Sequence, residues 1–242
     1  MPPAARRASH QPILALLIIG ATACAIVSCI RCTPPATSQP GGNLSAALGV
    51  PDPRADEAVY FLPFASNSTY VVAQGAFGVA GLGSHVGQYA IDFMLPFRTP
   101  ILAARGGKVI ALRQTCADVN CPFTPETCCG NYVRIEHADG SAASYWHLPQ
   151  NGACVKIGDL VARGDIIGVS GNTGISMAPH LHFEVRAPKG QAGTGRFGPS
   201  KDGSMEVSFA DVPGDGVPVL LGGYTSGNSV ATDRCAVTQP AS

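Results

Sequence analysis

Residues 178–185 read Ala178-Pro179-His180-Leu181-His182-Phe183-Glu184-Val185, and from His180 onward polar and apolar side chains alternate. Such alternation is typical of a β-strand with one buried face, because residues two apart in a strand point to the same side. His180 and His182 should therefore stand side by side, while Leu181, Phe183 and Val185 face a core. Two imidazoles on one strand face can both bind a metal, or one can bind while the other moves protons. The segment thus predicts part of an active site whose other ligands lie elsewhere in the chain.

The composition favours a mostly β domain. Glycine (29 residues) and proline (20 residues) together exceed a fifth of the 242-residue chain, and only 13% of residues are charged. This composition is typical of turns and short strands rather than long helices. The formal net charge is zero, so the chain lacks the basic footprint of a nucleic-acid-binding protein. The sequence does not set an oligomeric state.

From about Val59 the sequence reads as a series of short strands separated by turns. The predicted strands are residues 90–94, 100–104, 108–112, 132–136, 142–148, 155–161, 166–169 and 206–212. The Ala138-Asp139-Gly140 turn should join two of them as a hairpin, and Gly-Asp pairs at two strand entries resemble the tight turns of small β-barrels. We therefore expect a mostly β, antiparallel, small barrel-like domain over 57–212.

The first 28 residues are predicted to be a signal peptide of the lipoprotein type. Two arginines precede an apolar run over 13–27 that is short for a membrane span. The run ends in Ile26-Val27-Ser28-Cys29, which resembles a bacterial lipobox, where the leader is cut before a cysteine that is then lipidated. An uncleaved anchor helix is the alternative. Under both interpretations the remaining chain lies outside the cytoplasm, on a bacterial membrane that faces the periplasm or cell wall.

Two segments flank the predicted domain. Residues 29–56 are rich in Pro, Ser, Gly and Ala without an apolar period, so they are expected to form a flexible stalk. Residues 213–242 are expected to form a loop-rich, weakly ordered C-terminal tail.

Cysteine usage agrees with an oxidising compartment. Apart from Cys24 in the leader, Cys29 and Cys32, six cysteines remain, an even number suited to three disulfides. They are Cys116, Cys121, Cys128, Cys129, Cys154 and Cys235. The sequence leaves their pairing open, and a structural zinc knot built from the first four is an alternative. Because those four lie between two predicted strands, we expect a disulfide-rich surface insertion at 115–130.

Further candidate ligands accompany the His180 segment. His147 ends a predicted strand, and His85 lies seven residues before Asp92. Asp92 sits in an apolar strand, so its carboxylate must face solvent or be paired, because burying it alone is costly. A His, Asp and His set is usual for a catalytic zinc site with one open position, and two further histidines would then move protons. His137, beside a turn, is expected to be a solvated surface residue.

An ordered series of motifs over 77–186 resembles the lysostaphin/LytM-type zinc metallopeptidases, which hydrolyse peptide bonds in peptidoglycan. The motifs are His85 with Asp92, Pro100-Ile101-Leu102-Ala103-Ala104 with Gly107-Lys108-Val109, Tyr145-Trp146-His147-Leu148, Gly158-Asp159 with Gly164-Asp165-Ile166-Ile167-Gly168, Gly171-Asn172-Thr173-Gly174, and His180-Leu181-His182-Phe183-Glu184. The resemblance implies a zinc metallopeptidase domain over 57–212, with its core at 77–186 and peptidoglycan as partner.

The resemblance also implies roles for individual residues. His85, Asp92 and His182 would hold one Zn²⁺, while His147 and His180 would form the catalytic pair. One imidazole would accept a proton from water and the other would stabilise the developing oxyanion; which does which is open. Glu184 could orient one of the histidines, but we favour a solvated strand residue.

Two positions depart from the commonest family pattern. That pattern places the first histidine four residues before the aspartate, where this chain has Gln88, so the segment from His85 to Asp92 must loop back. Arg98 replaces the glycine that usually precedes the threonine of the Phe97-Arg98-Thr99-Pro100 turn. The change alters a turn near the site, where it would bear on substrate contacts rather than chemistry.

Three other functions compete with this interpretation. Some relatives have lost their zinc ligands and, as peptidoglycan-binding proteins, activate other hydrolases; a catalytically inactive lipoprotein of this kind is the main alternative. A lipoyl- or biotinyl-like carrier barrel needs a lysine in an exposed hairpin turn, and residues 171–174 contain none. A serine hydrolase built on Ser170 would need glycine where Asn172 stands. The peptide bond that is cut stays open.

Overall fold

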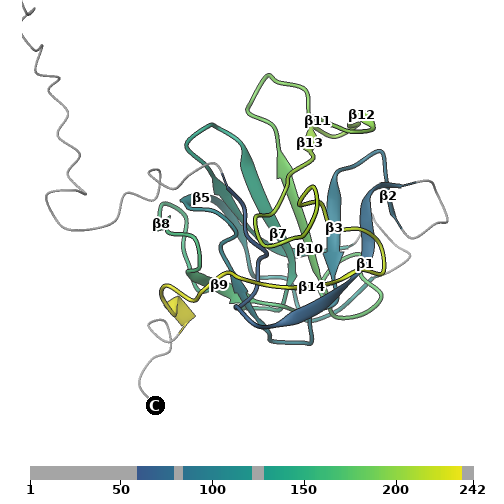
Figure 1. Cartoon of the computed structure of the whole chain (residues 1–242). Helices are drawn as coiled ribbons and strands as arrows, with labels where there is room; N and C mark the ends of the chain where they lie inside the picture. Colours follow the sequence, from purple (N-terminus) through teal and green to yellow (C-terminus); the bar gives the residue numbers. More distant parts are fainter. Residues whose placement is uncertain (1–58, 79–83, 122–127, 236–242) are drawn as a thin grey trace, which may run out of the picture. The chain divides into compact units, whose positions relative to one another are not determined.

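The computed structural model describes residues 59–78, 84–121 and 128–235, which form a β-rich domain with almost no helix (Figure 1). Within them the strands are β1 (Thr69–Gly78), β2 (Ser84–Val86), β3 (Ala90–Phe93), β4 (Pro100–Leu102), β5 (Gly107–Arg113), β6 (Asn131–Glu136), β7 (Ala142–Leu148), β8 (Leu160–Val161), β9 (Ile166–Val169), β10 (Leu181–Arg186), β11 (Thr194–Gly195), β12 (Gly198–Pro199), β13 (Ser204–Met205) and β14 (Gly223–Thr225). The predicted signal peptide, Cys29 and stalk lie outside the described residues. No helix in the described part of the chain has the length and apolarity needed to cross a membrane.

The main sheet places eight strands side by side in the order β14-β1-β3-β10-β7-β6-β5-β8. Strand β13 pairs with β10 and β2 pairs with β1, while β4 with β9 and β11 with β12 form two smaller pairs. Among the named strands, every pairing is antiparallel except that of β1 with β2. The predicted mostly β, antiparallel fold class is confirmed.

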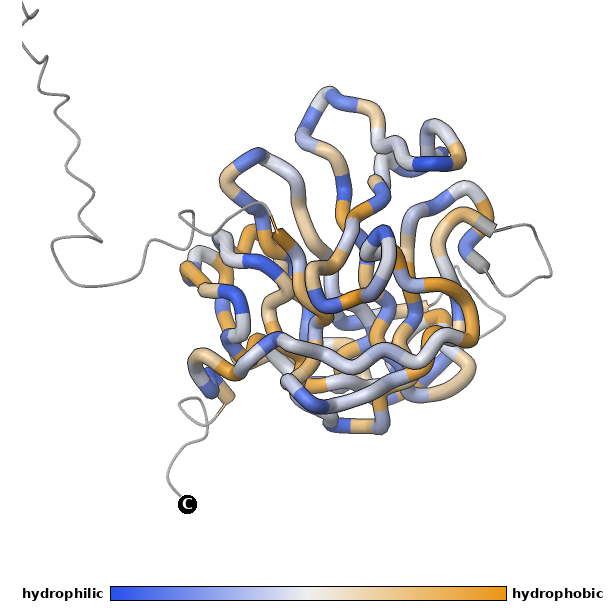
Figure 2. Tube along the Cα trace, in the orientation of Figure 1, coloured by the Kyte–Doolittle hydropathy of each residue, from blue (hydrophilic) through white to orange (hydrophobic). Residues whose placement is uncertain are grey.

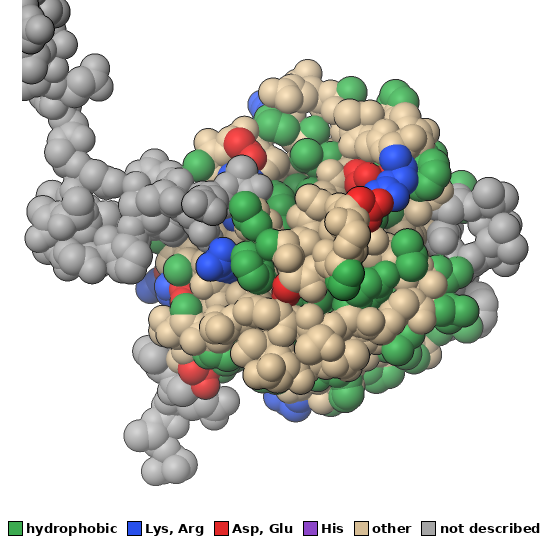
Figure 3. Space-filling model, viewed as in Figure 1, with side chains coloured by type: hydrophobic (Ala, Val, Ile, Leu, Met, Phe, Trp, Pro, Cys, Tyr) green, Lys and Arg blue, Asp and Glu red, His purple; other side chains and the backbone are tan. Residues whose placement is uncertain are grey.

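The core lies against the central strands. Apolar residues recur along the strands in Figure 2, and in β6 every second residue is buried, as a strand with one covered face requires. Tyr145 and Phe183, from neighbouring strands, are fully buried with their ring centroids 5.3 Å apart. The Tyr145 hydroxyl accepts a hydrogen bond from the Ala104 amide at 2.9 Å. Charged side chains are sparse on the face drawn in Figure 3, in keeping with the composition.

Some predicted strands are shorter than expected or absent. Residues 206–212 do not form a strand; the nearest one is β13, and the segment is a turn-rich connection instead. The reason is Asp211, whose carboxylate accepts hydrogen bonds from the Leu62 and Gly227 amides and so joins three segments. Of the strand predicted over 155–161, only β8 forms. Strands β1 and β14 were not predicted, because small residues and glycine weaken the alternation in both.

The C-terminal segment is loop-rich as predicted, but its described part is not weakly ordered. Strand β14 pairs with β1. The buried side chain of Asn228 donates hydrogen bonds to the Leu62 carbonyl at 3.1 Å and the Ala103 carbonyl at 3.2 Å. These contacts are invisible to local sequence patterns because their partners are more than a hundred residues away. Residues 213–235 therefore belong to the folded domain.

The six cysteines form three disulfides, Cys116–Cys129, Cys121–Cys128 and Cys154–Cys235. This confirms the number expected and supplies the pairing that the sequence left open. The zinc-knot alternative is wrong, because all four cysteines of the insertion are joined to each other.

His137 is not the solvated surface residue that its turn predicts. It is buried, its Nδ1 lies 2.8 Å from the Gly106 carbonyl oxygen, and the Tyr60 ring packs edge-on against it. Tyr60 reaches it from a segment 77 positions earlier in the chain, which local sequence does not reveal.

Candidate active site

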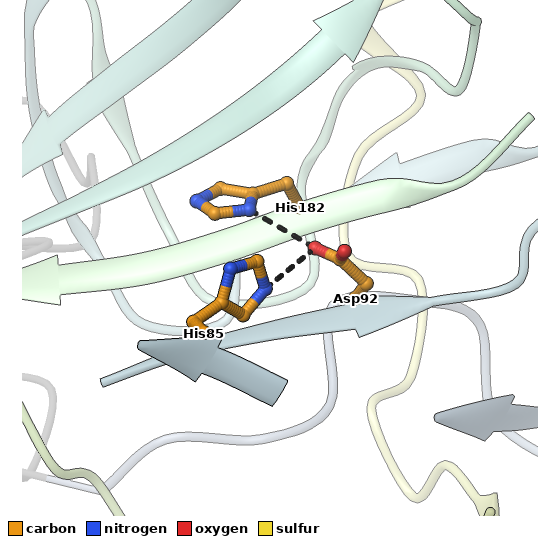
Figure 4. Close-up of side chains that lie close together, drawn as sticks. All are labelled: His85, Asp92 and His182. Carbon is orange, nitrogen blue, oxygen red and sulfur yellow. Dashed lines mark hydrogen bonds and ion pairs between the residues drawn. The ribbon is translucent and has the colours of Figure 1, made fainter. Parts of the chain in front are cut away.

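Strand pairing brings the three candidate ligands together. In the antiparallel pair of β3 with β10, His182 stands directly opposite Asp92. Strand β1 pairs with β3 on one side and with β2 through its later residues, and β2 carries His85. The chain turns back after β2 at Gly87, whose φ of +68° suits glycine. The longer spacing between His85 and Asp92 thus loops back as expected, and all three side chains converge (Figure 4).

The three side chains offer a nitrogen, an oxygen and a nitrogen. Asp92 Oδ1 lies 3.0 Å from His182 Nδ1 and 3.2 Å from His85 Nε2, and the ligand atoms all lie within 4.8 Å of one another. His85 Nε2 is buried and has no well-directed hydrogen-bond partner among the described residues. Two imidazole nitrogens and a carboxylate oxygen are donors that suit zinc. The residues therefore fit a metal ion.

The electrostatics of the site keep the carboxylate ionised. Burial would raise the pKa of Asp92, but the contacts from His182 and His85 outweigh it and hold that pKa well below its ordinary value. Burial likewise lowers the pKa of His182, yet the hydrogen bond to Asp92 and the charge of that carboxylate raise it overall. An anionic oxygen between imidazoles is ready to take a cation.

His147 and His180 face each other beside this cluster, with ring centroids 4.4 Å apart. His147 Nδ1 donates to the Thr173 carbonyl at 2.7 Å, and His180 Nδ1 donates to the Ala178 carbonyl at 2.8 Å. A carbonyl oxygen only accepts, so each Nδ1 carries the proton and each Nε2 is left free. His180 Nε2 lies 3.6 Å from Asp92 Oδ2. Two free ring nitrogens therefore adjoin the candidate metal site.

The backbone at His147 is held in an uncommon conformation. His147 lies where the pairing of β7 with β6 shifts register, between Trp146 and Leu148. Its φ of +69° is in the left-handed region that few residues other than glycine adopt. The backbone of residue 171 passes close to that of His147, and only glycine fits there, because a Cβ on Gly171 would lie 2.6 Å from the His147 carbonyl oxygen. Such conformations persist where the surrounding structure imposes them, and they cluster at functional sites.

Burial, followed by the charges of His180 and His182, lowers the pKa of His147 to about 3. His147 is therefore neutral at neutral pH, with the lone pair of its Nε2 available to accept a proton or hydrogen bond.

Residues 86–194 match the family described as Peptidase family M23, a stretch that contains Asp92, His147, His180 and His182 and begins one residue after His85. These residues form an M23 peptidase domain. The resemblance to lysostaphin/LytM-type peptidases drawn from the motifs is thereby confirmed.

Relatives of the M23 domain include proteins named as endopeptidases. Over 94 residues the chain is 39% identical to peptidoglycan DD-endopeptidase ShyA of Vibrio cholerae, covering 39% of this chain and 19% of ShyA. Over 107 residues it is 36% identical to glycyl-glycine endopeptidase ALE-1 of Staphylococcus capitis, covering 44% of this chain and 25% of ALE-1. The chain thus spans no more than a quarter of the length of these two relatives. A similar solved structure is the catalytic domain of lysostaphin from Staphylococcus simulans, with 31% identity, a TM-score of 0.37, and coverage of 52% of this chain and 84% of that one.

The M23 site opens into a cavity of about 610 Å³. Besides the five candidate site residues, its lining consists of uncharged side chains: Ala73, Gln74, Gln88, Met94, Trp146, Ile175, Ser176, Met177 and Ala178. Met177 is 83% exposed at the rim. Residues 175–178 were not predicted to line the site, because they lack any motif that sets them apart from an ordinary loop.

Two M23 residues singled out from the sequence have different surroundings from those expected. Glu184 is not solvated: it is buried, and its Oε1 accepts a hydrogen bond from Arg186 Nε at 3.0 Å. The buried carboxylate is paired, because Arg186 lies two residues further along the same face of β10. Arg98 has a φ of +63°, in the left-handed region that glycine adopts most readily, so this turn is one that favours glycine.

Proposed function

We propose that the M23 domain is a zinc-dependent endopeptidase that hydrolyses peptide bonds in the stem or cross-link peptides of peptidoglycan. The observation that carries the proposal is the convergence of His85, Asp92 and His182 beside two imidazoles with free Nε2 atoms. Similarity to ShyA and ALE-1, both named for cutting peptide bonds of this kind, supports the substrate class.

In this proposal one Zn²⁺ is held by His85 Nε2, an Asp92 oxygen and His182 Nδ1. When bound, zinc supplies Lewis-acid chemistry that acidifies water and polarises a peptide carbonyl. The chain's own residues handle the protons: the Nε2 of one catalytic imidazole, His147 or His180, accepts a proton from the attacking water. The Nε2 of the other donates a hydrogen bond to the oxyanion that develops, which requires that ring to carry a proton on both nitrogens as an imidazolium. The hydrogen bonds at Nδ1 orient both rings, and they fix the neutral ring in the tautomer that accepts a proton at Nε2.

The test of the proposed function is digestion of purified sacculi by the purified full chain. We expect soluble fragments with newly formed amino groups, loss of their release with a chelator, and its recovery on adding Zn²⁺. The matched control is Asp92→Ala, which should release nothing. If the zinc-loaded chain binds sacculi and releases no fragments, the endopeptidase proposal is contradicted, and the peptidoglycan-binding alternative takes its place.

We also propose that the chain is a lipoprotein, anchored to a bacterial membrane through Cys29 and facing the periplasm or cell wall. The lipobox-like sequence supports the anchor, and three disulfides support an oxidising compartment. Radiolabelled palmitate should label the wild type but not Cys29→Ser. An unlabelled wild type would contradict the anchor.

A further inference from the structure

The loop over residues 172–178 holds both catalytic imidazoles through its main chain. Its Thr173 carbonyl accepts the hydrogen bond from His147, and its Ala178 carbonyl accepts the one from His180. Within the loop, the buried Ser176 hydroxyl lies 2.6 Å from Asn172 Oδ1 and 3.1 Å from His180 Nδ1. Any shift of this loop therefore moves the two groups that would handle protons.

The first arm of the disulfide insertion, Val119-Asn120-Cys121, lies along this loop. The Cys121 amide donates to the Gly174 carbonyl at 2.9 Å, and the Gly174 amide donates to the Val119 carbonyl at 3.3 Å. The Asn120 side chain donates through Nδ2 to the Ser176 carbonyl at 3.2 Å. Three hydrogen bonds thus join this arm to the loop.

The second arm, residues 128–131, contacts the same loop. The Asn131 amide donates to Thr173 Oγ1 at 3.0 Å, and Thr173 Oγ1 in turn donates to the Leu148 carbonyl at 2.7 Å. The backbones of Gly130 and Gly174 touch so closely that a Cβ on Gly174 would lie 2.8 Å from Gly130 Cα. The loop is therefore held from both arms.

The two disulfides of the insertion tie the arms to each other, Cys116 to Cys129 and Cys121 to Cys128. The Asn131 side chain adds hydrogen bonds to the backbone of Cys116 at 3.0 and 2.9 Å. We propose that the disulfide-linked insertion positions residues 172–178, and through them His147 and His180, so that its disulfides set the rate of peptide hydrolysis. This inference rests on the proposed function.

Loosening the insertion should change the positions of His147 and His180 without removing the metal ligands. Misplacing a catalytic group by about 1 Å can cost about 100-fold in rate. The hydrogen bonds and disulfides that the described residues of the two arms form do not involve His85, Asp92 or His182. We therefore expect zinc to stay bound when the insertion is loosened. The expected signature of a loosened insertion is a lower kcat with an unchanged KM and metal content.

The test compares two disulfide deletions in the full chain. The double variant Cys121→Ser/Cys128→Ser is expected to lower kcat about 10- to 100-fold while keeping KM and zinc. The matched control, Cys154→Ser/Cys235→Ser, removes a disulfide away from the loop; it should lower the thermal midpoint more but keep kcat at temperatures where it is folded. Equal kcat in the wild type and the insertion variant would overturn the proposal, as would a fall in kcat that matches a loss of zinc.

A second measurement tests whether His147 and His180 are held in place, and it does not require the chain to be active. Proton–nitrogen NMR should show slowly exchanging Nδ1 protons of His147 and His180 in the wild type and the control. Both should exchange faster in the insertion variant. If the wild type proves inactive but this pattern holds, only the proposed function fails; unchanged exchange in the insertion variant would contradict the positioning role itself.

Asn120 is a positioning residue in the same account. Asn120→Ala removes one hydrogen bond, so we expect kcat to fall about 2- to 10-fold with KM unchanged. Asn120→Asp keeps the shape of the side chain, but its ionised carboxylate cannot donate a hydrogen bond. Its kcat should fall to a similar extent. A change confined to KM would assign Asn120 to substrate binding instead.

Discussion

His180→Ala is expected to keep its zinc and lose most of its turnover. His180 lies outside the three-atom ligand cluster, and its free Nε2 adjoins that cluster, 3.6 Å from Asp92 Oδ2. General acid–base groups typically contribute about 10²- to 10⁴-fold, so kcat should fall by that order. The measurements are metal analysis of the purified variant and the initial rate of fragment release from sacculi.

The companion variant is His147→Ala, in which the other free Nε2 is removed. It should show the same combination of retained zinc and low kcat. Loss of zinc from His180→Ala together with retained zinc in His182→Ala would reverse the assignment of the two strand histidines.

Removing the Cys154–Cys235 disulfide is expected to cause the largest loss of stability. The two cysteines are 81 positions apart, and closing a loop of this length restricts the unfolded chain by roughly 4 kcal/mol. The bond also ties the C-terminal segment, with Asn228 buried against two other segments, to the domain. Urea unfolding of Cys154→Ser/Cys235→Ser should show a free energy of unfolding lower by about 2–5 kcal/mol.

The control for this prediction is the Cys121–Cys128 bond, which spans only 7 positions and should contribute roughly 2 kcal/mol. A smaller loss of stability without the long-range bond than without the short one would contradict the prediction. The two variants should therefore differ in opposite ways: loss of Cys154–Cys235 should lower the free energy of unfolding more, and loss of Cys121–Cys128 should lower kcat more.

Much of the fold follows from local alternation. Strands β3, β5, β6, β7 and β10 were predicted within a residue or two. In β6 one buried face imposes a period of two, whereas all four residues of β3 are buried and its short apolar run indicated the strand. The failures share a different cause. The segment at 206–212 is shaped by the Asp211 side chain, and His137 is covered by Tyr60. Both depend on contacts between segments that no local pattern encodes.

The five candidate site residues were named from the sequence as one set. The structure brings His85, Asp92, His147, His180 and His182 to one cavity, as the motif series implied. Their individual roles stay predictions. The sequence could not show the groups that orient the two catalytic imidazoles, because these are the backbone carbonyls of Thr173 and Ala178. A carbonyl acceptor carries no signature of residue type, so only the folded chain reveals it.

The most direct test of the account is the zinc content of the purified wild type and of His180→Ala and His182→Ala prepared alongside it. We expect one zinc per chain in the wild type and in His180→Ala, and close to none in His182→Ala, which lacks one of the three ligands. Equal zinc in both variants, or a wild type that takes up no zinc, would contradict it.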